Sequence, residues 1–586
     1  MYMREKSRIF VREKDNAFKK TRKISMKKTV LYAGLAALVA MTSCSKLKIT
    51  GDNFRVTPTP LEAIGGQVSA TITANFPEKC IPKKAVVTVT PVLKYEGGEA
   101  ASESATFQGQ KVEGNGTTVQ YKVGGSYGMK ANWAYQDAML KSDLYARFDA
   151  KIGKKVKEVP EVKIGYGILA TAQLLKYCTV TGATAPDAYQ RIIRQKQEAN
   201  IKFLINQANL RTSETGSVSI QDMVKVLKEI NDNHQTRALQ DIEVSAYASP
   251  DGKYDFNERL AEQRQNVSDK FLQDQLKKIG MDAYVNTKYT AEDWDGFQQL
   301  ISQSNLQDKD VILRVLSMYQ DPEEREQQIR NMSSVYTEIA DGILPELRRA
   351  RLLVNYEVIG RSDEQILAQF AMDASKLSVE ELLYGACRLL TMADQKAVWF
   401  KKTQELYPSD YRAFNNYAQL CIMRGDLAEA ETYLNKAAAI NANAPEVNAN
   451  RAVIAMKNGN VEMAEQYMGK ASGADTYQEI LGALNIANGS YGQADKNLEN
   501  ANTNTAALAQ ILNKNYRAAR NTLANTKTQN AVTCYLKAVL AARTGDKNGV
   551  GSALREAVAK DASLAKRALN DVEFKDYATI VESVCR

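Results

Sequence analysis

One arginine, Arg264, is the residue whose type and position point most clearly to a binding site. Leu260, Val267 and Phe271 recur at the spacing of one helical face, because successive helical residues lie about 100° apart around the axis. Arg264 falls on the same apolar stripe. Burying a guanidinium is costly unless it is paired. The position therefore indicates either an internal ion pair with a core carboxylate or contact with the carboxylate of a ligand.

Residues suited to catalysis are few. His234 is the only histidine, and it lies in a polar stretch with no neighbour that would make it a base or a metal ligand. The sequence has no Gly-rich phosphate loop ending in Lys-Ser/Thr, no Gly-x-Ser-x-Gly elbow and no HExxH helix. Its cysteines lack CxxC spacing and histidine partners, so no zinc site is predicted. We therefore expect no enzyme, no metal and no cofactor; a cell-wall hydrolase is the remaining enzymatic alternative.

The helix that carries Arg264 is expected to follow a strand and a turn. Apolar and polar residues alternate over 241–248, and Pro250-Asp251-Gly252 has the residue types of a tight turn. A long helix is predicted from about Asp255, which with Glu258 three residues later has the pattern of an N-terminal cap. Strands alternating with helices over 196–360 predict a small α/β sandwich. The other expected elements are strands at 201–205 and 351–358, a helix at 221–230 and a helical insertion at 295–340.

These residues resemble the C-terminal domain of the OmpA family. The strand and turn end in Ser249-Pro-Asp-Gly252, and the next helix carries Asn257-Glu-Arg-Leu-Ala-Glu-Gln-Arg264 followed by Val267. The family shows a strand, a turn ending in glycine and then Asn-x-x-Leu-Ser-x-x-Arg with a following valine. Residues 203–210 are similar to its first strand, and 347–351 stand where its last strand begins. The resemblance covers 196–360 and implies an OmpA-like fold with an insertion that compact members lack.

The resemblance implies noncovalent binding of peptidoglycan through the diaminopimelate side chain of its stem peptide. That group is zwitterionic, so the pocket needs a cation and an anion. Arg264 matches the family's arginine, which can donate two parallel hydrogen bonds to a carboxylate. Ser249 stands where the family has an aspartate, so Asp251 or Asp255 would have to hold the ammonium, with Asn257 as a further contact. The alternatives are a plain turn residue for Asp251 and a helix cap for Asp255.

Residues 48–165 predict a β-sandwich. Apolar and polar positions alternate in 67–73 and 85–90, which are rich in Val, Ile and Thr, and pairs such as Asn115-Gly116 break the runs. Nothing in this segment resembles a catalytic motif. A linker is expected over 166–195.

Residues 377–575 predict a helical solenoid that resembles tetratricopeptide (TPR) repeats. Tyr411 to Ala444 forms one 34-residue unit with a turn at Gly425, and its pattern of small residues returns around Gly459, Gly489 and Gly545. Stacked helix pairs form an extended concave surface, so we expect a protein partner in this groove. The alternative is a rigid arm without a specific ligand.

The N-terminal residues 1–44 predict a leader and signal peptide, with Met26 as the expected true start. A basic start at Met26 precedes an apolar stretch, 30–41, that is too short to span a bilayer. Thr42-Ser43-Cys44 follows, which resembles the end of a bacterial lipoprotein signal and implies lipidation of Cys44. No acidic run follows Cys44, which favours an outer-membrane anchor facing the periplasm.

The charge distribution argues against a nucleic-acid partner. The formal charge is +9, but residues 1–43 contain eleven Lys and Arg and three acids, so the rest is nearly neutral. The sequence thus predicts a multidomain α+β lipoprotein of the outer membrane that binds peptidoglycan and scaffolds envelope proteins. The alternative is an accessory or assembly subunit of a surface fibre or secretion complex, in which the OmpA-like domain no longer binds the wall.

Overall fold

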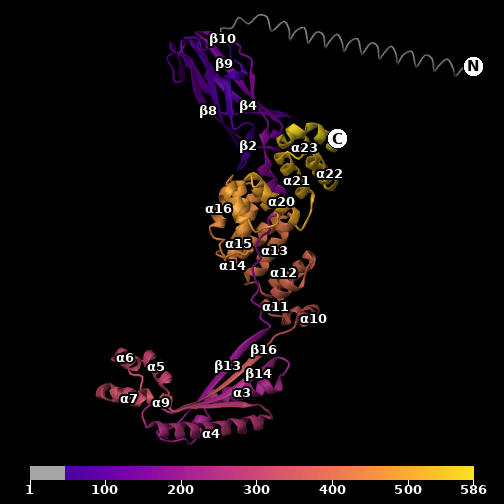
Figure 1. The fold of residues 1–586 in the computed structure, drawn as a ribbon. Coiled ribbons are helices and arrows are strands. Elements are labelled where there is room, and N and C mark those ends of the chain that lie inside the picture. Colours follow the sequence, from indigo (N-terminus) through magenta and orange to yellow (C-terminus); the bar gives the residue numbers. More distant parts are fainter. Residues whose placement is uncertain (1–46) are drawn as a thin grey trace, which may run out of the picture. The chain divides into compact units, whose positions relative to one another are not determined.

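The computed structural model describes residues 47–586, which divide into two compact units (Figure 1). Unit 1 combines the chain up to Ala185 with Pro408–Arg586, and unit 2 is Pro186–Tyr407. The predicted leader and Cys44 lie outside the described residues.

The N-terminal part of unit 1 consists of two β-sheets packed face to face. One sheet has the order β1-β3-β2-β12, with β8 also paired to β3; the other has the order β10-β9-β4-β6-β7, with β11 and β5 at its margins. Phe76 of one sheet and Phe107 of the other have ring centroids 5.0 Å apart, so the two apolar faces share one core. The strands are β1 (Phe54–Thr57), β2 (Leu61–Ile64), β3 (Gln67–Phe76), β4 (Ala85–Tyr95), β5 (Gly98–Ala101), β6 (Ala105–Gly109), β7 (Thr117–Val119), β8 (Gly125–Ala134), β9 (Ser142–Ile152), β10 (Lys155–Lys157), β11 (Val162–Tyr166) and β12 (Ile168–Leu169).

The predicted linker 166–195 is shorter than expected. β12 adds to the first sheet by pairing in parallel with β2, and η3 (Thr171–Tyr177) follows as a 3-10 helix. The longest stretch without regular structure in this range is 178–191. The difference arises because Ile168 and Leu174 are buried, which ties the start of this segment to unit 1.

Unit 2 is built on a four-stranded mixed sheet with the order β13-β16-β14-β15. β14 (Arg237–Tyr247) and β15 (Val285–Thr290) are parallel, whereas β16 (Arg349–Ile359) is antiparallel to both β13 (Ile192–Lys202) and β14. Helices α3 (Val218–Asp232) and α4 (Tyr254–Ile279) share one core with the sheet (Figure 1). A short helix, α2 (Thr212–Thr215), precedes them.

The first strand of this sheet is not the predicted one at 201–205. β13 ends at Lys202, and the apolar Leu204 and Ile205 are 47% and 56% exposed in the following turn. Sequence periodicity failed here because most of β13 is exposed and polar, so it carries no alternating signal.

The predicted insertion is a cluster of short helices with its own apolar core. It runs from Trp294 to Leu347 and is built around buried residues such as Phe297, Ile312 and Ile339. The helices of the insertion are α5 (Trp294–Gln303), α6 (Lys309–Met318), α7 (Pro322–Arg330), α8 (Ser333–Gly342) and α9 (Leu344–Leu347).

Three α-helices complete unit 2 after β16. They are α10 (Asp363–Asp373), α11 (Val379–Tyr384) and α12 (Ala393–Leu406).

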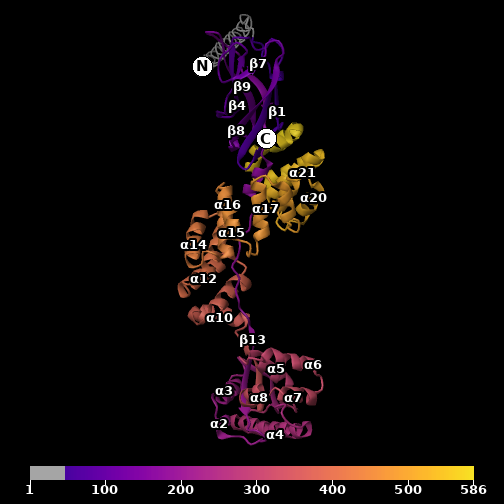
Figure 2. The same cartoon turned by 90° about the vertical axis from the view of Figure 1, so that its left-hand side faces the viewer.

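The C-terminal part of unit 1 confirms the helical repeats as stacked antiparallel pairs, but they begin at Tyr411 and not at 377, because 377–407 belongs to unit 2 (Figure 2). In four pairs the turn between the helices carries a glycine with positive φ: Gly425, Gly459, Gly489 and Gly545. The pair α19–α20, which the sequence did not reveal, has Lys514 at φ 63° instead. The helices are α13 (Tyr411–Arg424), α14 (Leu427–Ile440), α15 (Pro445–Lys457), α16 (Val461–Met468), α17 (Tyr477–Ala487), α18 (Tyr491–Asn497), α19 (Asn504–Leu512), α20 (Tyr516–Asn525), α21 (Ala531–Thr544), α22 (Lys547–Lys560), α23 (Ser563–Asn570) and α24 (Ala578–Cys585).

Candidate functional site

The predicted site in unit 2 lies where β14 ends and α4 begins. Asn257, in the first turn of α4, is 4% exposed. Its Nδ2 donates hydrogen bonds to the main-chain oxygens of Ser249 and Gly252, each at 3.1 Å. Asn257 therefore fixes the shape of the turn, and its amide donors are used within the domain.

The turn carboxylate, Asp251, is paired with an arginine that the sequence did not single out. The Ser249 hydroxyl donates to Asp251, and Nη2 of Arg348 donates to Asp251 Oδ2 at 3.1 Å. Arg348 Nε also donates to the Ser249 hydroxyl at 3.2 Å, and this arginine is 9% exposed. Arg330 of the insertion donates to the main-chain oxygen of Asp251 at 2.6 Å. The only carboxylate of the turn is thus neutralised within the protein.

Arg264 is sealed inside unit 2, with 1% of its surface exposed. Its Nε, Nη1 and Nη2 donate to the main-chain oxygens of Gln207 (3.0 Å), Tyr247 (2.9 Å) and Leu204 (3.2 Å). The guanidinium carbon lies 5.2 Å from the ring centroid of Phe203. Among the described residues, no carboxylate lies within 4.0 Å of the Arg264 nitrogens, so the hypothesis of an internal ion pair is wrong.

The pKa of Arg264 shows the electrostatic consequence of this environment. Burial lowers it to about 10, and the nearby positive charge of Arg348 adds to the effect, which Asp251 only partly offsets. Carbonyl oxygens satisfy the donors of the guanidinium but do not cancel its charge. The cation is therefore satisfied by hydrogen bonds and not by an anion.

Asp255, the other candidate for the ammonium, does not join this cluster. It is exposed in the first turn of α4, where its main-chain oxygen accepts a hydrogen bond from Arg259 at 3.1 Å. The helix cap predicted for it is wrong, because Lys253 occupies the N-cap position and no side chain caps the helix. The chain enters the helix earlier than the Asp255–Glu258 pattern indicated.

The helical insertion covers the turn. Pro250 and Asp251 face Trp294, Phe297 and Ile329, and the cavity left between them measures about 10 Å³. A cavity of this size holds one water molecule at most. The insertion therefore packs closely against this side of the turn and leaves no room there for a diaminopimelate group.

Residues 47–586 contain no cluster of three or more His, Cys, Asp or Glu side chains arranged to hold a metal ion. None of the helices described there is long and apolar enough to cross a membrane. His234 is exposed in the loop before β14.

The sequence matches no family model, and no curated protein gives a significant match. Among solved structures, a tetratricopeptide repeat protein from Parabacteroides merdae is 13% identical, with a TM-score of 0.27 over 44% of this chain and 98% of its own. The pilF protein of Pseudomonas aeruginosa is 19% identical, with a TM-score of 0.24 over 37% and 95%. Yeast Tom70 is 11% identical, with a TM-score of 0.23 over 63% and 80%. TM-scores of this size carry no argument about function, and the repeats are established by the chain's own helix pairs.

Proposed function

We propose that this chain is a non-enzymatic scaffold of the bacterial cell envelope whose OmpA-like domain serves as a closed structural module. The burial of Arg264 carries this proposal. The guanidinium nitrogens that would have to donate hydrogen bonds to a ligand carboxylate already donate to main-chain oxygens. The repeats supply an extended helical surface of the kind that binds proteins. The proposal shares one feature with the alternative predicted from the sequence, an accessory or assembly subunit of a surface fibre or secretion complex: an OmpA-like domain that no longer binds the wall.

The cover over the turn supports the same proposal. A wall-binding pocket for a zwitterion needs a free anion beside its arginine. Here the Asp251 carboxylate is paired with Arg348. The side chain of Arg330, in the insertion, also donates a hydrogen bond to the main-chain oxygen of Asp251. Removing one partner from a buried ion pair is strongly unfavourable, so Asp251 would not be released easily to an incoming ammonium.

Peptidoglycan binding is the second candidate function. The pattern of Asn257 and Arg264, together with a mixed sheet that carries the turn at the end of a central strand, favours it. It requires the insertion to move away from the turn and Asp251 to exchange Arg348 for the ammonium of diaminopimelate.

Sedimentation with purified sacculi separates the two candidates. We expect the wild-type protein to remain in the supernatant. Co-sedimentation that free diaminopimelate reverses, and that Asp251→Asn abolishes, would overturn the closed-module proposal in favour of wall binding. Asp255→Asn is the matched control, because it removes a neighbouring carboxylate that is exposed and lies outside the cluster.

The envelope location rests on the signal pattern that ends in Cys44. We propose a lipid anchor at this residue, in the outer membrane and facing the periplasm. Metabolic labelling with a fatty-acid analogue should mark the wild-type protein in the outer-membrane fraction and should not mark Cys44→Ala. Equal labelling of both proteins would exclude Cys44 as the acceptor.

A further inference from the structure

The segment between η3 and unit 2 is held by the inner helices of the repeats. Residues 178–185 have no regular secondary structure, and Cys178, Val180, Gly182, Ala183 and Ala185 are buried in unit 1. Thr179 is exposed, and its main-chain oxygen accepts a hydrogen bond from Thr505 of α19 at 3.4 Å. A segment without regular structure is thus buried along several repeats.

Two asparagines bind this segment through its main chain. Asn450 of α15 accepts from the N–H of Ala183 and donates to its C=O, both at 2.8 Å. Asn416 of α13 does the same with Ala185, at 2.7 and 2.9 Å. Each side-chain amide thus pairs with both polar groups of one residue, as a neighbouring β-strand would.

A third asparagine joins the two into a row. Asn415 donates to the oxygen of Ala183 at 3.1 Å and accepts from Asn450 at 2.9 Å. It also donates to Asn416 at 3.1 Å, and all three asparagines are at most 1% exposed. We call these three residues the asparagine row. Their hydrogen bonds to the segment all go to its peptide groups, so these bonds require no particular polar side chain in the segment.

Shape selects small residues at the centre of the segment. A Cβ atom at Gly182 would overlap the side-chain oxygen of Asn450 and lie 3.2 Å from Cγ of Gln419. Glycine is therefore required at this point for the segment to reach the asparagine row.

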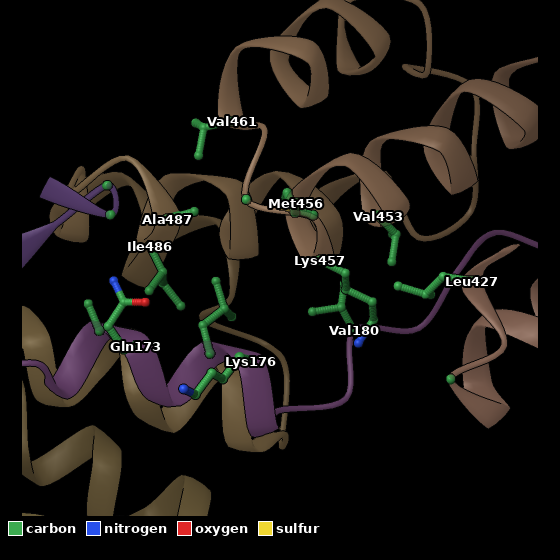
Figure 3. Close-up of a pocket in the computed structure, with 16 residues that line it drawn as sticks. Gln173, Lys176, Val180, Leu427, Val453, Met456, Lys457, Val461, Ile486 and Ala487 are labelled. Carbon is green, nitrogen blue, oxygen red and sulfur yellow. The ribbon is translucent and has the colours of Figure 1, made fainter. Parts of the chain in front are cut away.

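The segment does not fill the groove. Val180 borders a cavity of about 320 Å³ whose walls include Leu427, Val453, Met456 and Ile486 (Figure 3). A cavity of this size has room for a larger side chain than valine. The chain's own segment therefore pairs with the asparagine row but leaves apolar contacts beside Val180 unused.

We propose that the asparagine row forms a peptide-binding site that recognises the main chain of its ligand. Residues 178–185 fill this site when no partner is bound. A partner protein displaces them with an extended segment that has glycine at the position of Gly182. Because residues 178–185 are tethered to the repeats, they compete with a free peptide at an effective concentration in the millimolar range. The proposal goes beyond the scaffold role and holds whether or not the chain is anchored in the envelope.

Peptide binding to the full-length protein tests this site. The probe is a fluorescent peptide of residues 176–187 with Cys178→Ser, and binding is followed by fluorescence anisotropy. In Gly182→Val the tethered segment cannot reach the asparagine row, so we expect the peptide to bind about 100-fold more tightly than it binds the wild-type protein. Thr179→Val is the matched control, because it adds a branched side chain at an exposed position of the same segment, and it should behave as wild type.

Two further arms show that binding uses the asparagine row. Asn450→Ala in the Gly182→Val background should remove the gain, and a probe that itself carries Gly182→Val should not bind. A Gly182→Val protein that gains no binding, while its repeat helices keep wild-type protection from hydrogen exchange, would overturn the proposal.

Hydrogen exchange covers the case in which Gly182→Val fails to fold. In the double variant Asn416→Ala and Asn450→Ala, the amides of Ala183 and Ala185 lose their acceptors and should exchange at least about tenfold faster. Unchanged exchange of these amides would show that the row does not hold the segment and would also overturn the proposal.

Discussion

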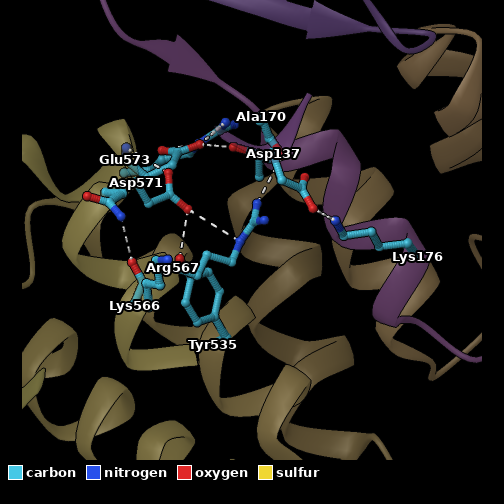
Figure 4. A network of polar contacts seen from close by, with 11 residues as sticks. Asp137, Ala170, Lys176, Tyr535, Lys566, Arg567, Asp571 and Glu573 are labelled. Carbon is cyan, nitrogen blue, oxygen red and sulfur yellow. Dashed lines mark hydrogen bonds and ion pairs between the residues drawn. The ribbon is translucent and has the colours of Figure 1, made fainter. Parts of the chain in front are cut away.

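Each unit contains a buried arginine, Arg264 in unit 2 and Arg567 in unit 1, and the two differ in the groups that surround the guanidinium. Arg264 of unit 2 donates to three main-chain oxygens and has no carboxylate within ion-pair distance in the described structure. Arg567 of unit 1, with 9% of its side chain exposed, donates to the main-chain oxygen of Ala170 at 3.2 Å (Figure 4). Its Nε lies 3.9 Å from Oδ2 of Asp571, which is itself 1% exposed in its side chain.

The pKa values of the two arginines move in opposite directions. Burial lowers that of Arg264 to about 10. Burial also opposes the charge of Arg567, but the oxygens of Tyr535 and Asp571 outweigh it, so its pKa is raised. Main-chain carbonyls thus satisfy a buried cation without neutralising it, whereas a carboxylate neutralises it. Arg264 organises the loops around it, and Arg567 takes part in an ion pair.

The largest expected effect comes from removing Arg567. Arg567→Met leaves the fully buried Asp571 without its cation, which should lower the free energy of unfolding by about 3 kcal/mol. Burial already raises the pKa of Asp571, and the loss of Arg567 would raise it further. A raised carboxyl pKa costs stability as the pH rises through it, so the loss should be greater at about pH 8 than at about pH 4. Urea unfolding followed by circular dichroism at both pH values measures it.

Lys566→Met is the control for this prediction. It makes the same kind of change one residue earlier on α23, at an exposed position, and should leave stability within about 0.5 kcal/mol of wild type. A loss in Arg567→Met that is equal at both pH values would show that Asp571 is not the group left unpaired.

Sequence periodicity was sufficient for the elements that carry the candidate site. The alternation over 241–248 matches β14. The apolar stripe around Arg264 matches α4 only in part: Leu260 is buried, but Val267 and Phe271 are half-buried, and the buried face continues through Ser268, Leu272 and Leu276. Both signals are local, because each element has one face in the core. The glycine turns of the repeats were equally readable, except where Lys514 takes the same conformation at a position that sequence rules reserve for glycine.

The partners of the site residues could not be read in the same way. Arg348 reaches Asp251 because β16 lies beside β14 in the sheet, although the two residues are 97 positions apart in sequence. The asparagine row depends on Asn415 and Asn450 facing each other from successive repeats across 35 positions. Such pairs are set by tertiary packing, and in a single sequence these residues look like ordinary surface polar residues.

A smaller effect, and a sharper test of the comparison, is expected from Arg264→Met. The main-chain oxygens of Leu204, Gln207 and Tyr247 would lose the hydrogen bonds that join their segments through Arg264, and this loss should exceed the relief from removing a buried charge. We expect a net loss of about 2 kcal/mol, with faster hydrogen exchange in 203–210. Because the loss involves no carboxylate partner, it should be the same at about pH 4 and about pH 8.

Arg259→Met on the exposed side of the same helix is the matched control, since it removes a guanidinium that only contacts the main chain of Asp255. Its stability should stay within about 0.5 kcal/mol of wild type. If Arg264→Met instead loses more stability at the higher pH, a carboxylate such as Asp251 depends on Arg264, and the two arginines are alike. A gain in stability would mean that the buried charge outweighs its three hydrogen bonds, in which case Arg264 is retained for a ligand and wall binding regains its basis.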